Sequence, residues 1–463
     1  MKNTINNFWL LCWEQNVQVI VKVIKLEGRG RSKCEQYWPD HGSEIYGTIR
    51  VELKSELKLC NDCIRTFEIS STVNGEVRVV KHYQYLQWPD PGLPSCPGPV
   101  LAFVRRVHSF EPPGCRPTVV HCSAGVGRSA CYIAIDAMLE RIKYDNMIDI
   151  YGYVNMMRLQ RNFMVQTDEQ YMFVYDVLVE AIECGVTELT SREFSAEFKQ
   201  LTALLNNGRE TLLETQFKSL STVDEYDSSA MTVAYANEHK NRSKVIVPFD
   251  SNRVQLQPLR SHEGSNYINA SYINGYYRPC QFITTQGPSE KTVADFWRMI
   301  MDVNCTIIVM ISNLDIINDV IRNICQYHYL NWPIGRVPDS SESLIEIIGH
   351  VQKASDKFSP LSPIVVHSNI GAGRTGVFIT LSIALENLRN EDKVDIYQIV
   401  KSLRHQKPYM VESLEQYEFC HKVVFRMNAS YLLQDANYEV EAMNEEEKII
   451  VKLRKIQVQA EFR

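Results

Sequence analysis

The sequence contains an internal repeat, which restricts the chain to two domains of the same kind. A Phe-Trp pair at residues 8–9 recurs at 296–297, 288 residues later, and Asp149 recurs as Asp395, 246 residues later. Solenoid repeats are about 20–50 residues long, so a repeat of this length indicates two homologous domains. The 463 residues suffice for two or three domains, and 45% of apolar residues suffice for full cores.

The most informative repeated segment is a glycine-containing loop at residues 119–129. Two β-branched residues and a histidine precede Cys122, two glycines follow it, and Arg128 closes the loop. Residues 130–139 are mostly apolar and predict a buried helix. A strand, a glycine loop and a helix start together form an anion cradle, because backbone N–H groups converge there and the helix dipole adds positive charge. We call residues 122–128 the first cradle.

Cys122 in such a cradle has the properties of a nucleophile. Its thiolate is expected to be stabilised, with a pKa below the usual value of roughly 8.5. Arg128 carries a planar fork that can hold two phosphate oxygens. The pattern therefore predicts phosphoryl transfer through a cysteinyl-phosphate. The structural alternative is a buried cysteine in a turn, which His121, the glycines and Ser129 together disfavour.

A second Cys-x5-Arg segment in the chain provides a comparison. Cys420 and Arg426 have the same spacing, but no glycine lies between them, and the flanking residues continue a helical pattern. We interpret Cys420 as a structural residue.

The first cradle resembles the signature loop of the protein tyrosine phosphatases, His-Cys-x5-Arg-Ser/Thr. His121, Cys122, Arg128 and Ser129 match it, and Ala130 stands where the family usually has glycine. The resemblance covers most of the chain, and the tandem arrangement resembles the cytoplasmic half of a receptor-type tyrosine phosphatase. It implies an α/β (α+β) fold with two tandem tyrosine-phosphatase-like domains, each a twisted mixed sheet flanked by helices.

The resemblance also implies a role for individual residues. Asp90, in the Trp-Pro-Asp segment at residues 88–94, corresponds to the general acid, which later acts as general base. Gln166 and Gln170 correspond to the family's glutamine loop, which orients the water of the second step. The implied catalytic residues are Cys122, Asp90, Arg128, Ser129, Gln166, Gln170 and His121. The implied substrate-binding residues are Cys122, Ser123, Ala124, Gly125, Val126, Gly127 and Arg128.

Two of these segments have structural alternatives. The prolines and glycine around Asp90 fit a hinged lid, and the alternative is a simple turn. Another Trp-Pro-Asp ends at Asp40, but it follows a run that resembles a structural hairpin beside the family's active site, so we interpret Asp40 as a surface turn. In the glutamine loop, Thr167 would be a helix N-cap with Gln170 as its capping-box partner, which is compatible with the functional role.

The second copy of the cradle differs at three chemically important positions. Ser368 stands at the nucleophile position, Ile334 at the position of the acid and Glu412 at the position of Gln166. A serine hydroxyl ionises too weakly to replace a thiolate, and a carboxylate repels phosphate. We therefore expect a catalytically inactive second domain with a structural or regulatory role.

The repeat offsets also predict where each domain is incomplete. About ninety residues before position 296 have no counterpart before position 8, so the first domain is expected to lack its front. In that front, Ser243 replaces the tyrosine that in the family stacks on the substrate ring. The second domain is expected to lack about forty residues between Asn313 and Trp332, and residues 223–238 are expected to be irregular. The predicted parts are a phosphatase domain at 1–184, a linker with a helix at 185–235, a phosphatase-like domain at 236–430 and a charged tail at 431–463.

The net charge and the cysteine content restrict which binding partners and which cellular compartment are expected. The net charge of −6 argues against nucleic acid as the main partner. The thirteen cysteines, including the lone Cys-x-x-Cys at residues 60–63, lack metal-ligand spacing and fit a reduced intracellular setting. No metal or other cofactor is expected. No apolar run approaches the roughly 20 residues of a membrane span, so a cytoplasmic location is expected, as for these domains in a single-pass plasma-membrane receptor.

Two function hypotheses follow from these observations. The first is a metal-independent protein tyrosine phosphatase that uses Cys122, Asp90 and Arg128 on phosphotyrosine-containing proteins, with contacts through the second domain within the chain or in a dimer. The second is a pseudophosphatase or scaffold, inactive because its first domain is truncated. A dual-specificity or low-molecular-weight phosphatase is a more distant third, disfavoured by the tandem organisation and by the segment around Asp90.

Overall fold

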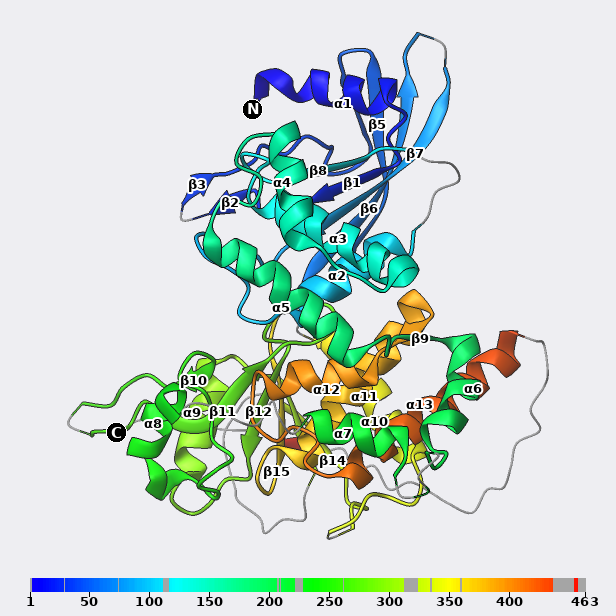
Figure 1. Cartoon of the computed structure of the whole chain (residues 1–463). Coiled ribbons are helices and arrows are strands. Elements are labelled where there is room, and N and C mark those ends of the chain that lie inside the picture. Colours follow the sequence, from blue (N-terminus) through cyan, green and yellow to red (C-terminus); the bar gives the residue numbers. More distant parts are fainter. Residues whose placement is uncertain are drawn as a thin grey trace. The chain divides into compact units, whose positions relative to one another are not determined.

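The structure is a computed structural model with two compact units, residues Met1–Val186 and Thr187–Arg463. It describes residues 2–28, 30–73, 75–110, 116–205, 208, 210–220, 228–260, 262–311, 324–333, 335–358, 360–435 and 454–456. Each unit contains one large mixed sheet with helices packed against it (Figure 1). The predicted α/β fold with two tandem domains is therefore confirmed.

The sheet of the first unit combines parallel and antiparallel strands. Its strands are β1 (Val19–Lys22), β4 (Ser43–Tyr46), β5 (Ile49–Lys58), β6 (Asp62–Ser71), β7 (Val77–Tyr85) and β8 (Thr118–His121). Their order is β4-β5-β6-β7-β1-β8, with β1 parallel to both β7 and β8 and the other pairs antiparallel. Two short strands, β2 (Glu27–Gly28) and β3 (Arg31–Ser32), form a separate hairpin.

Both faces of this sheet are covered, because strand side chains alternate between the two faces. Helix α1 (Ile5–Glu14) packs on one face through Trp9 and Cys12, against Ile20 and Phe67. The opposite face carries the second core, which includes residues of the four remaining helices. They are α2 (Gly98–His108), α3 (Arg128–Asp145), α4 (Ile150–Gln160) and α5 (Asp168–Cys184). The predicted buried helix at 130–139 is therefore confirmed as part of α3.

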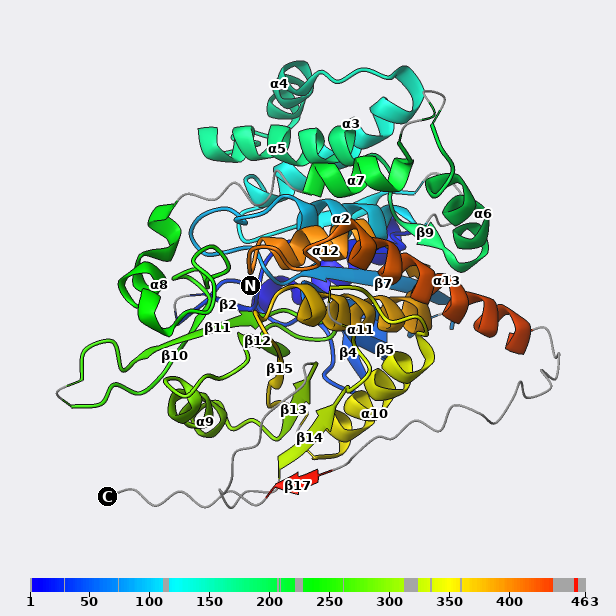
Figure 2. The same ribbon diagram turned by 90° about the horizontal axis from the view of Figure 1, so that it is seen from below.

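The second unit repeats this plan around a seven-stranded sheet (Figure 2). Its order is β10-β11-β12-β15-β13-β14-β17. The strands are β10 (Arg253–Gln255), β11 (Tyr267–Ile273), β12 (Phe282–Gln286), β13 (Ile307–Met310), β14 (Ile324–His328), β15 (Ile364–Ser368) and β17 (Arg454–Ile456). A two-stranded sheet joins β9 (Leu189–Thr190) to β16 (Lys393–Val394).

Helices cover both faces of the second sheet as well, since every residue of β13 and β15 is buried. Helix α9 (Val293–Asp302) packs on one face through Phe296 and Met299. Helices α10 and α11 contact the same central strands. The helices of this unit are α6 (Ser191–Leu201), α7 (Leu212–Leu220), α8 (Thr232–Ala236), α9, α10 (Glu342–Phe358), α11 (Gly373–Glu391), α12 (Ile396–Arg404) and α13 (Leu414–Asp435).

The strand that leads into each cradle has different neighbours in the two units. β15 lies between β12 and β13 and is fully buried. β8 pairs with β1 and, within the described residues, has no strand on its other side, and all four of its residues are partly or fully exposed. The first cradle therefore lies at an open edge of its sheet.

Several expectations about the connecting segments are settled by the structure. The helix expected in the linker at 185–235 is present as two helices, α6 and α7. The expectation of irregular chain at 223–238 is wrong from residue 228 onward, where short helices at Ser228–Met231, Thr232–Ala236 and Glu238–Lys240 follow one another. Helix α13 continues to Asp435, so the helix extends past the expected end of the second domain at 430. Residues 221–227, 312–323 and Ile334, and most of the expected tail, lie outside the described residues.

Candidate active site

The first cradle connects the end of β8 to the start of α3. Gly125 has a φ of 70°, a left-handed conformation that glycine adopts without strain. Its N–H lies 3.3 Å from the Cys122 sulfur. Helix α3 begins at Arg128 without a side-chain cap, so N–H groups of its first turn remain available to an anion.

The surroundings of Cys122 favour its thiolate. Burial alone would raise the pKa of the thiol, but hydrogen bonds from the hydroxyl and N–H of Ser129 and from the N–H groups of Gly125 and Val126 hold the pKa below its usual value. The Ser129 hydroxyl is buried and has no other hydrogen-bond partner in the described part of the chain. Burial raises the pKa of Cys131, two residues further along α3, to about 12. Of these two thiols, Cys122 is the one that ionises readily.

Asp90 lies over the cradle and contacts its arginine. Arg128 Nη2 donates to Asp90 Oδ1 at 3.1 Å and to the carbonyl oxygen of Pro89 at 2.9 Å. Lys33 Nζ forms an ion pair with Asp90 Oδ2 at 2.8 Å. The hydrogen bond from Lys33, followed by the charges of Lys33 and Arg128, holds the pKa of Asp90 below its usual value. The carboxylate thus occupies a donor of Arg128 that a phosphate oxygen would use.

His121 supports the cradle from within the fold. Its Nε2 lies 2.7 Å from the Tyr37 hydroxyl, which is also 2.9 Å from Nε2 of His82. Burial lowers the pKa of His121 to about 4, so the ring is neutral at pH 7. His121 therefore positions the loop that carries Cys122, and it does not line the cavity above the loop.

The glutamine loop lies against the cradle at the start of α5. Thr167 Oγ1 accepts a hydrogen bond from the N–H of Gln170 at 3.2 Å, so the predicted N-cap is confirmed. Gln170 Oε1 accepts from the N–H of Gln166 at 2.9 Å, whereas a capping box requires a bond to the cap residue itself. The capping-box prediction is therefore wrong. The Gln170 amide packs on Gly127, where an added Cβ would lie 2.9 Å from Nε2.

Two arginines that the sequence analysis did not identify hold these loops together. Arg158 donates to the carbonyl oxygen of Val165 at 2.7 Å, and the N–H of Val165 donates to the carbonyl oxygen of Val126 at 3.0 Å. Val165 has a φ of 57°, which is strained for a β-branched residue. Arg161 donates to the carbonyl oxygen of Ala124 at 3.1 Å. These bonds fix the glutamine loop relative to the cradle.

Eight of the twelve predicted site residues line one cavity of about 620 Å³, whereas His121, Gly125, Val126 and Ser129 do not. Its walls include Cys122, Asp90, Arg128, Gln166 and Gln170. Lys33 also lines it and was not identified as a site residue, although it lies in the segment that resembles the family's hairpin beside the active site. The full lining consists of Ile24, Lys33, Asp90, Pro91, Gly92, Leu93, Cys122, Ser123, Ala124, Gly127, Arg128, Gln166, Thr167, Glu169 and Gln170. Within the described residues, no group of three or more His, Cys, Asp or Glu side chains could hold a metal ion.

Comparison with known families agrees with this geometry. The family profile described as protein-tyrosine phosphatase matches residues 1–180, 237–320 and 315–426. The chain belongs to the protein-tyrosine phosphatase family. The first match covers the first unit and the other two lie in the second, so the chain carries two tandem phosphatase domains.

Receptor-type phosphatases are among the relatives of this tyrosine phosphatase chain. It is 41% identical to receptor-type tyrosine-protein phosphatase S of Gallus gallus, over 93% of this chain and 31% of the relative. It is 40% identical to tyrosine-protein phosphatase Lar of Drosophila melanogaster, over 93% of this chain and 24% of the relative. For receptor-type tyrosine-protein phosphatase F of Homo sapiens the identity is 39%, over 93% and 25%. The chain thus spans less than a third of the length of these relatives.

The cradle of the second phosphatase domain has a different polar environment. The Ser368 hydroxyl accepts from the N–H of Gly371 at 3.2 Å, which matches the arrangement at Cys122. Arg374 donates to the carbonyl oxygen of Pro333 at 3.3 Å. The Glu412 side chain packs closely against Gly373 of this loop, since a Cβ added at Gly373 would lie 2.5 Å from Oε1 of Glu412. Glu412 therefore places a carboxylate beside the anion site.

No helix in the part of the chain that the structure describes is both long and apolar enough to cross a membrane.

Proposed function

We propose that the first domain hydrolyses phosphotyrosine in proteins through a cysteinyl-phosphate on Cys122, without a metal or other cofactor. The observation that supports this most directly is the convergence of three groups on one cavity. A thiol with a lowered pKa, Cys122, lies beside Arg128, and the carboxyl group of Asp90 is 3.1 Å from that arginine. These groups are a nucleophile, an anion holder and a proton carrier.

In the first step the phosphate displaces Asp90 from Arg128 and occupies the cradle. The Cys122 sulfur attacks phosphorus, and the bond from phosphorus to the tyrosine oxygen breaks. The phenolate oxygen takes the proton of Asp90. Loss of the Arg128 contact raises the pKa of the Asp90 carboxyl, which favours the protonated form that this step requires.

In the second step a water molecule hydrolyses the cysteinyl-phosphate. Asp90, now a carboxylate, accepts a proton from the water, the new oxygen–phosphorus bond forms, and the sulfur–phosphorus bond breaks. The Cys122 thiolate leaves readily because its pKa is low. The amides of Gln166 and Gln170, which line the cavity, are placed to orient the water.

We also propose that the second domain is catalytically inactive and acts in structure or regulation. Ser368 and Glu412 support this role, since one lacks a thiol and the other adds negative charge to the cradle. The proposed partners are phosphotyrosine-containing proteins, with additional contacts through the second domain within the chain or in a dimer. The proposed location of these domains is the cytoplasm, as expected for relatives of the receptor type.

The alternative function is a pseudophosphatase or scaffold, and the open edge at β8 favours it. In the second domain, β12 pairs with β15. The Thr284 hydroxyl on β12 also donates to the carbonyl oxygen of Gly371, in the second cradle, at 2.8 Å. The first cradle has no equivalent strand among the described residues. A loop supported on one side holds its geometry less firmly, and catalysis is sensitive to displacements of about 1 Å.

Two substrates distinguish the proposed function from its alternative. The wild-type chain should hydrolyse para-nitrophenyl phosphate and a phosphotyrosine peptide, and Cys122→Ser should abolish both activities. The exposed Cys280 provides the matched control, because Cys280→Ser should retain both. Asp90→Asn should slow peptide hydrolysis by about 10²–10⁴-fold and affect para-nitrophenyl phosphate less, since nitrophenolate leaves without a proton. Equal inactivity of the wild type and Cys122→Ser would establish the pseudophosphatase alternative.

A further inference from the structure

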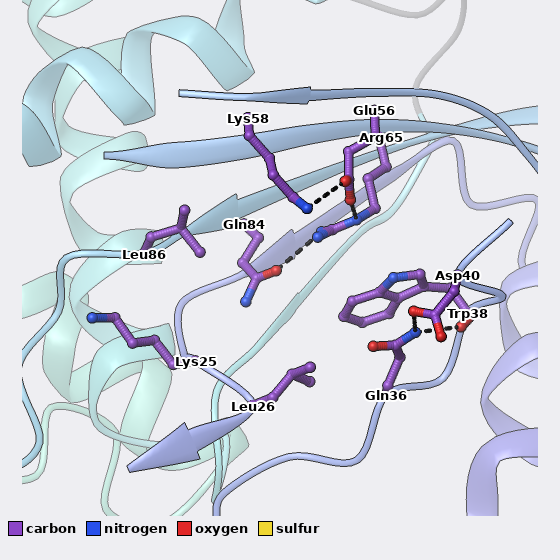
Figure 3. A pocket seen from close by; sticks show the side chains of 10 residues that line it. All are labelled: Lys25, Leu26, Gln36, Trp38, Asp40, Glu56, Lys58, Arg65, Gln84 and Leu86. Atoms are coloured by element: carbon purple, nitrogen blue, oxygen red, sulfur yellow. Dashed lines mark hydrogen bonds and ion pairs between the residues drawn. The ribbon is translucent and has the colours of Figure 1, made fainter. Parts of the chain in front are cut away.

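A second cavity in the first domain, separate from the candidate active site, has a volume of about 380 Å³. It lies where β5, β6 and β7 meet the segment that follows β1 (Figure 3). This cavity shares no lining residue with the cavity above Cys122. Its size is within the usual range of small-molecule sites, about 300–1,000 Å³. The residues that carry the argument are Lys25, Trp38, Glu56, Lys58, Arg65 and Gln84.

The carboxylates at this cavity already have partners. Glu56 accepts from Arg65 Nε at 2.6 Å and forms an ion pair with Lys58 at 2.9 Å. Asp40 accepts from the amide of Gln36 at 2.7 Å. Glu56 is therefore shared by two cations, whereas Asp40 is bonded to a neutral amide and keeps its charge in the cavity wall.

The cations are not fully paired. Arg65 uses Nε on Glu56 and Nη1 on Gln84 at 3.0 Å, and its Nη2 makes no hydrogen bond to a described residue. Its guanidinium lies 4.6 Å from the centre of the Trp38 ring. Lys25 has no ion pair or hydrogen bond with any described residue. The cavity wall therefore has an excess of positive charge, with Lys25, Lys58 and Arg65 against Asp40 and Glu56.

A buried lysine behind the wall adds to this charge. Lys22 is 0% exposed, and its Nζ has no hydrogen-bond partner among the described residues. It pairs in register with Gln84, and its Nζ lies 4.7 Å from the centre of the Trp38 ring. Burial lowers the pKa of Lys22 to about 8, so the amine is still mostly protonated at pH 7. A buried cation without a counter-ion is costly, and an anion in the adjacent cavity would compensate it.

The second domain supports the view that this cation is not needed for the fold. Lys22 pairs with His121 between β1 and β8, and the equivalent pair in the second domain joins Met310 to His367. An apolar methionine therefore fills the same position in the homologous sheet. Packing alone therefore does not explain why the first domain has a lysine at this position.

We propose that this cavity binds a small oxyanion ligand, one that carries several carboxylate or phosphate groups. Arg65 and Lys25 would contact the anion, and Lys22 would attract it from behind Trp38. Leu26 and Leu86 provide apolar walls for the remainder of the ligand. This inference does not depend on the proposed phosphatase activity, because the cavity lies apart from Cys122.

The test measures binding and does not require turnover. The full chain with Arg128→Met and Arg374→Met, which removes the arginine of both cradles, is titrated calorimetrically with citrate and, separately, with inorganic phosphate. We expect saturable binding of at least one probe at one site. Citrate alone would indicate a polycarboxylate ligand, and phosphate would indicate a phosphorylated one.

Substitutions in the same background locate the site. Lys22→Met should weaken binding about tenfold while the chain stays folded, as Met310 indicates, and Lys25→Gln should weaken it several-fold. Lys54→Gln is the matched control, because Lys54 lies on β5 like Lys58 but does not line the cavity. Absence of saturable binding, or equal affinity in the folded Lys22→Met variant, would overturn the proposal. Binding of an acidic peptide in place of both small anions would overturn it as well.

Discussion

Asp90 and Arg128 contact each other directly, with Nη2 of the arginine 3.1 Å from Oδ1 of the carboxylate. In the proposed mechanism, the phosphate of the substrate separates this pair before phosphoryl transfer. That separation would remove a cation from the carboxyl group, and the pKa of Asp90 would rise. The proposal therefore couples substrate binding to protonation of Asp90, and Lys33, the other ionic partner of Asp90, would limit how far its pKa rises.

Lys33→Met is expected to extend activity to higher pH. Lys33 contributes the largest lowering of the pKa of Asp90, so its removal keeps the acid protonated at pH values where the wild type has lost its proton. The alkaline limb of the kcat profile on a phosphotyrosine peptide should move to higher pH. The value of kcat at the optimum should fall several-fold, because the 2.8 Å ion pair also orients the carboxyl group.

Lys54→Met provides the control for this pH profile. Lys54 is exposed on β5 and pairs with Glu52 and Glu68, not with the acid. Its profile should match that of the wild type. An alkaline limb that stays in place in Lys33→Met would show that Asp90 is not the group titrating there.

Ser129→Ala is expected to make the nucleophile less acidic. The Ser129 hydroxyl is among the groups that lower the pKa of Cys122, and hydrogen bonds to charged groups contribute about 1.5–3 kcal/mol. The midpoint of the pH dependence of iodoacetamide alkylation should therefore move to higher pH. Ser123→Ala is the control within the same loop, since the Ser123 hydroxyl donates to the carbonyl oxygen of Lys33 at 3.3 Å. A midpoint equal in Ser129→Ala and the wild type would contradict the assigned role.

The repeat and the glycine loop predict the local structure around Cys122, because it depends on residues close in sequence. The spacing between Cys122 and Arg128 predicts a strand, a loop and a helix start, and all three are present. Thr167 was likewise predicted as a cap from adjacent residues. Local rules of this kind do not need tertiary contacts.

Some contacts between residues distant in the sequence are not predicted by it. Lys33 reaches Asp90 across 57 positions, and no pattern within either segment indicates the pairing. Arg158 had a usable signal, since Arg404 stands at the equivalent position of the second domain and makes the same bond, to the carbonyl oxygen of Val411 at 2.8 Å. The register that places Lys22 beside His121 requires the sheet order, which the sequence pattern does not provide.

Acidification is expected to destabilise the first domain through His121 and His82, whose pKa values are lowered in the fold. Burial lowers the pKa of His121 to about 4, so the unfolded chain binds a proton near pH 6.5 that the folded domain takes up only near pH 4. The stabilisation is thus complete above pH 6.5 and is lost as the pH falls to 4, by up to about 3 kcal/mol for this residue. Urea unfolding measures this loss of stability, and hydrogen exchange of the amides of β8 monitors it locally.

His121→Gln tests the contribution of this side chain. The variant has no imidazole to titrate, so its free energy of unfolding should fall less between pH 6.5 and 4 than that of the wild type. His82, which is also buried with a lowered pKa, accounts for part of the remaining slope. Identical slopes in the variant and the wild type would exclude His121 as the titrating group.

Restoring the thiol of the second domain is expected to be insufficient for activity. In a Cys122→Ser background, Ser368→Cys introduces a nucleophile into a cradle beside Glu412, and that carboxylate keeps the pKa of the thiol high and repels phosphate. Adding Glu412→Gln should lower the midpoint of iodoacetamide alkylation and yield slow hydrolysis of para-nitrophenyl phosphate, a substrate that needs no acid. A phosphotyrosine peptide should stay resistant, because Ile334 cannot donate a proton. Equal hydrolysis with and without Glu412→Gln would show that the carboxylate does not control this cradle.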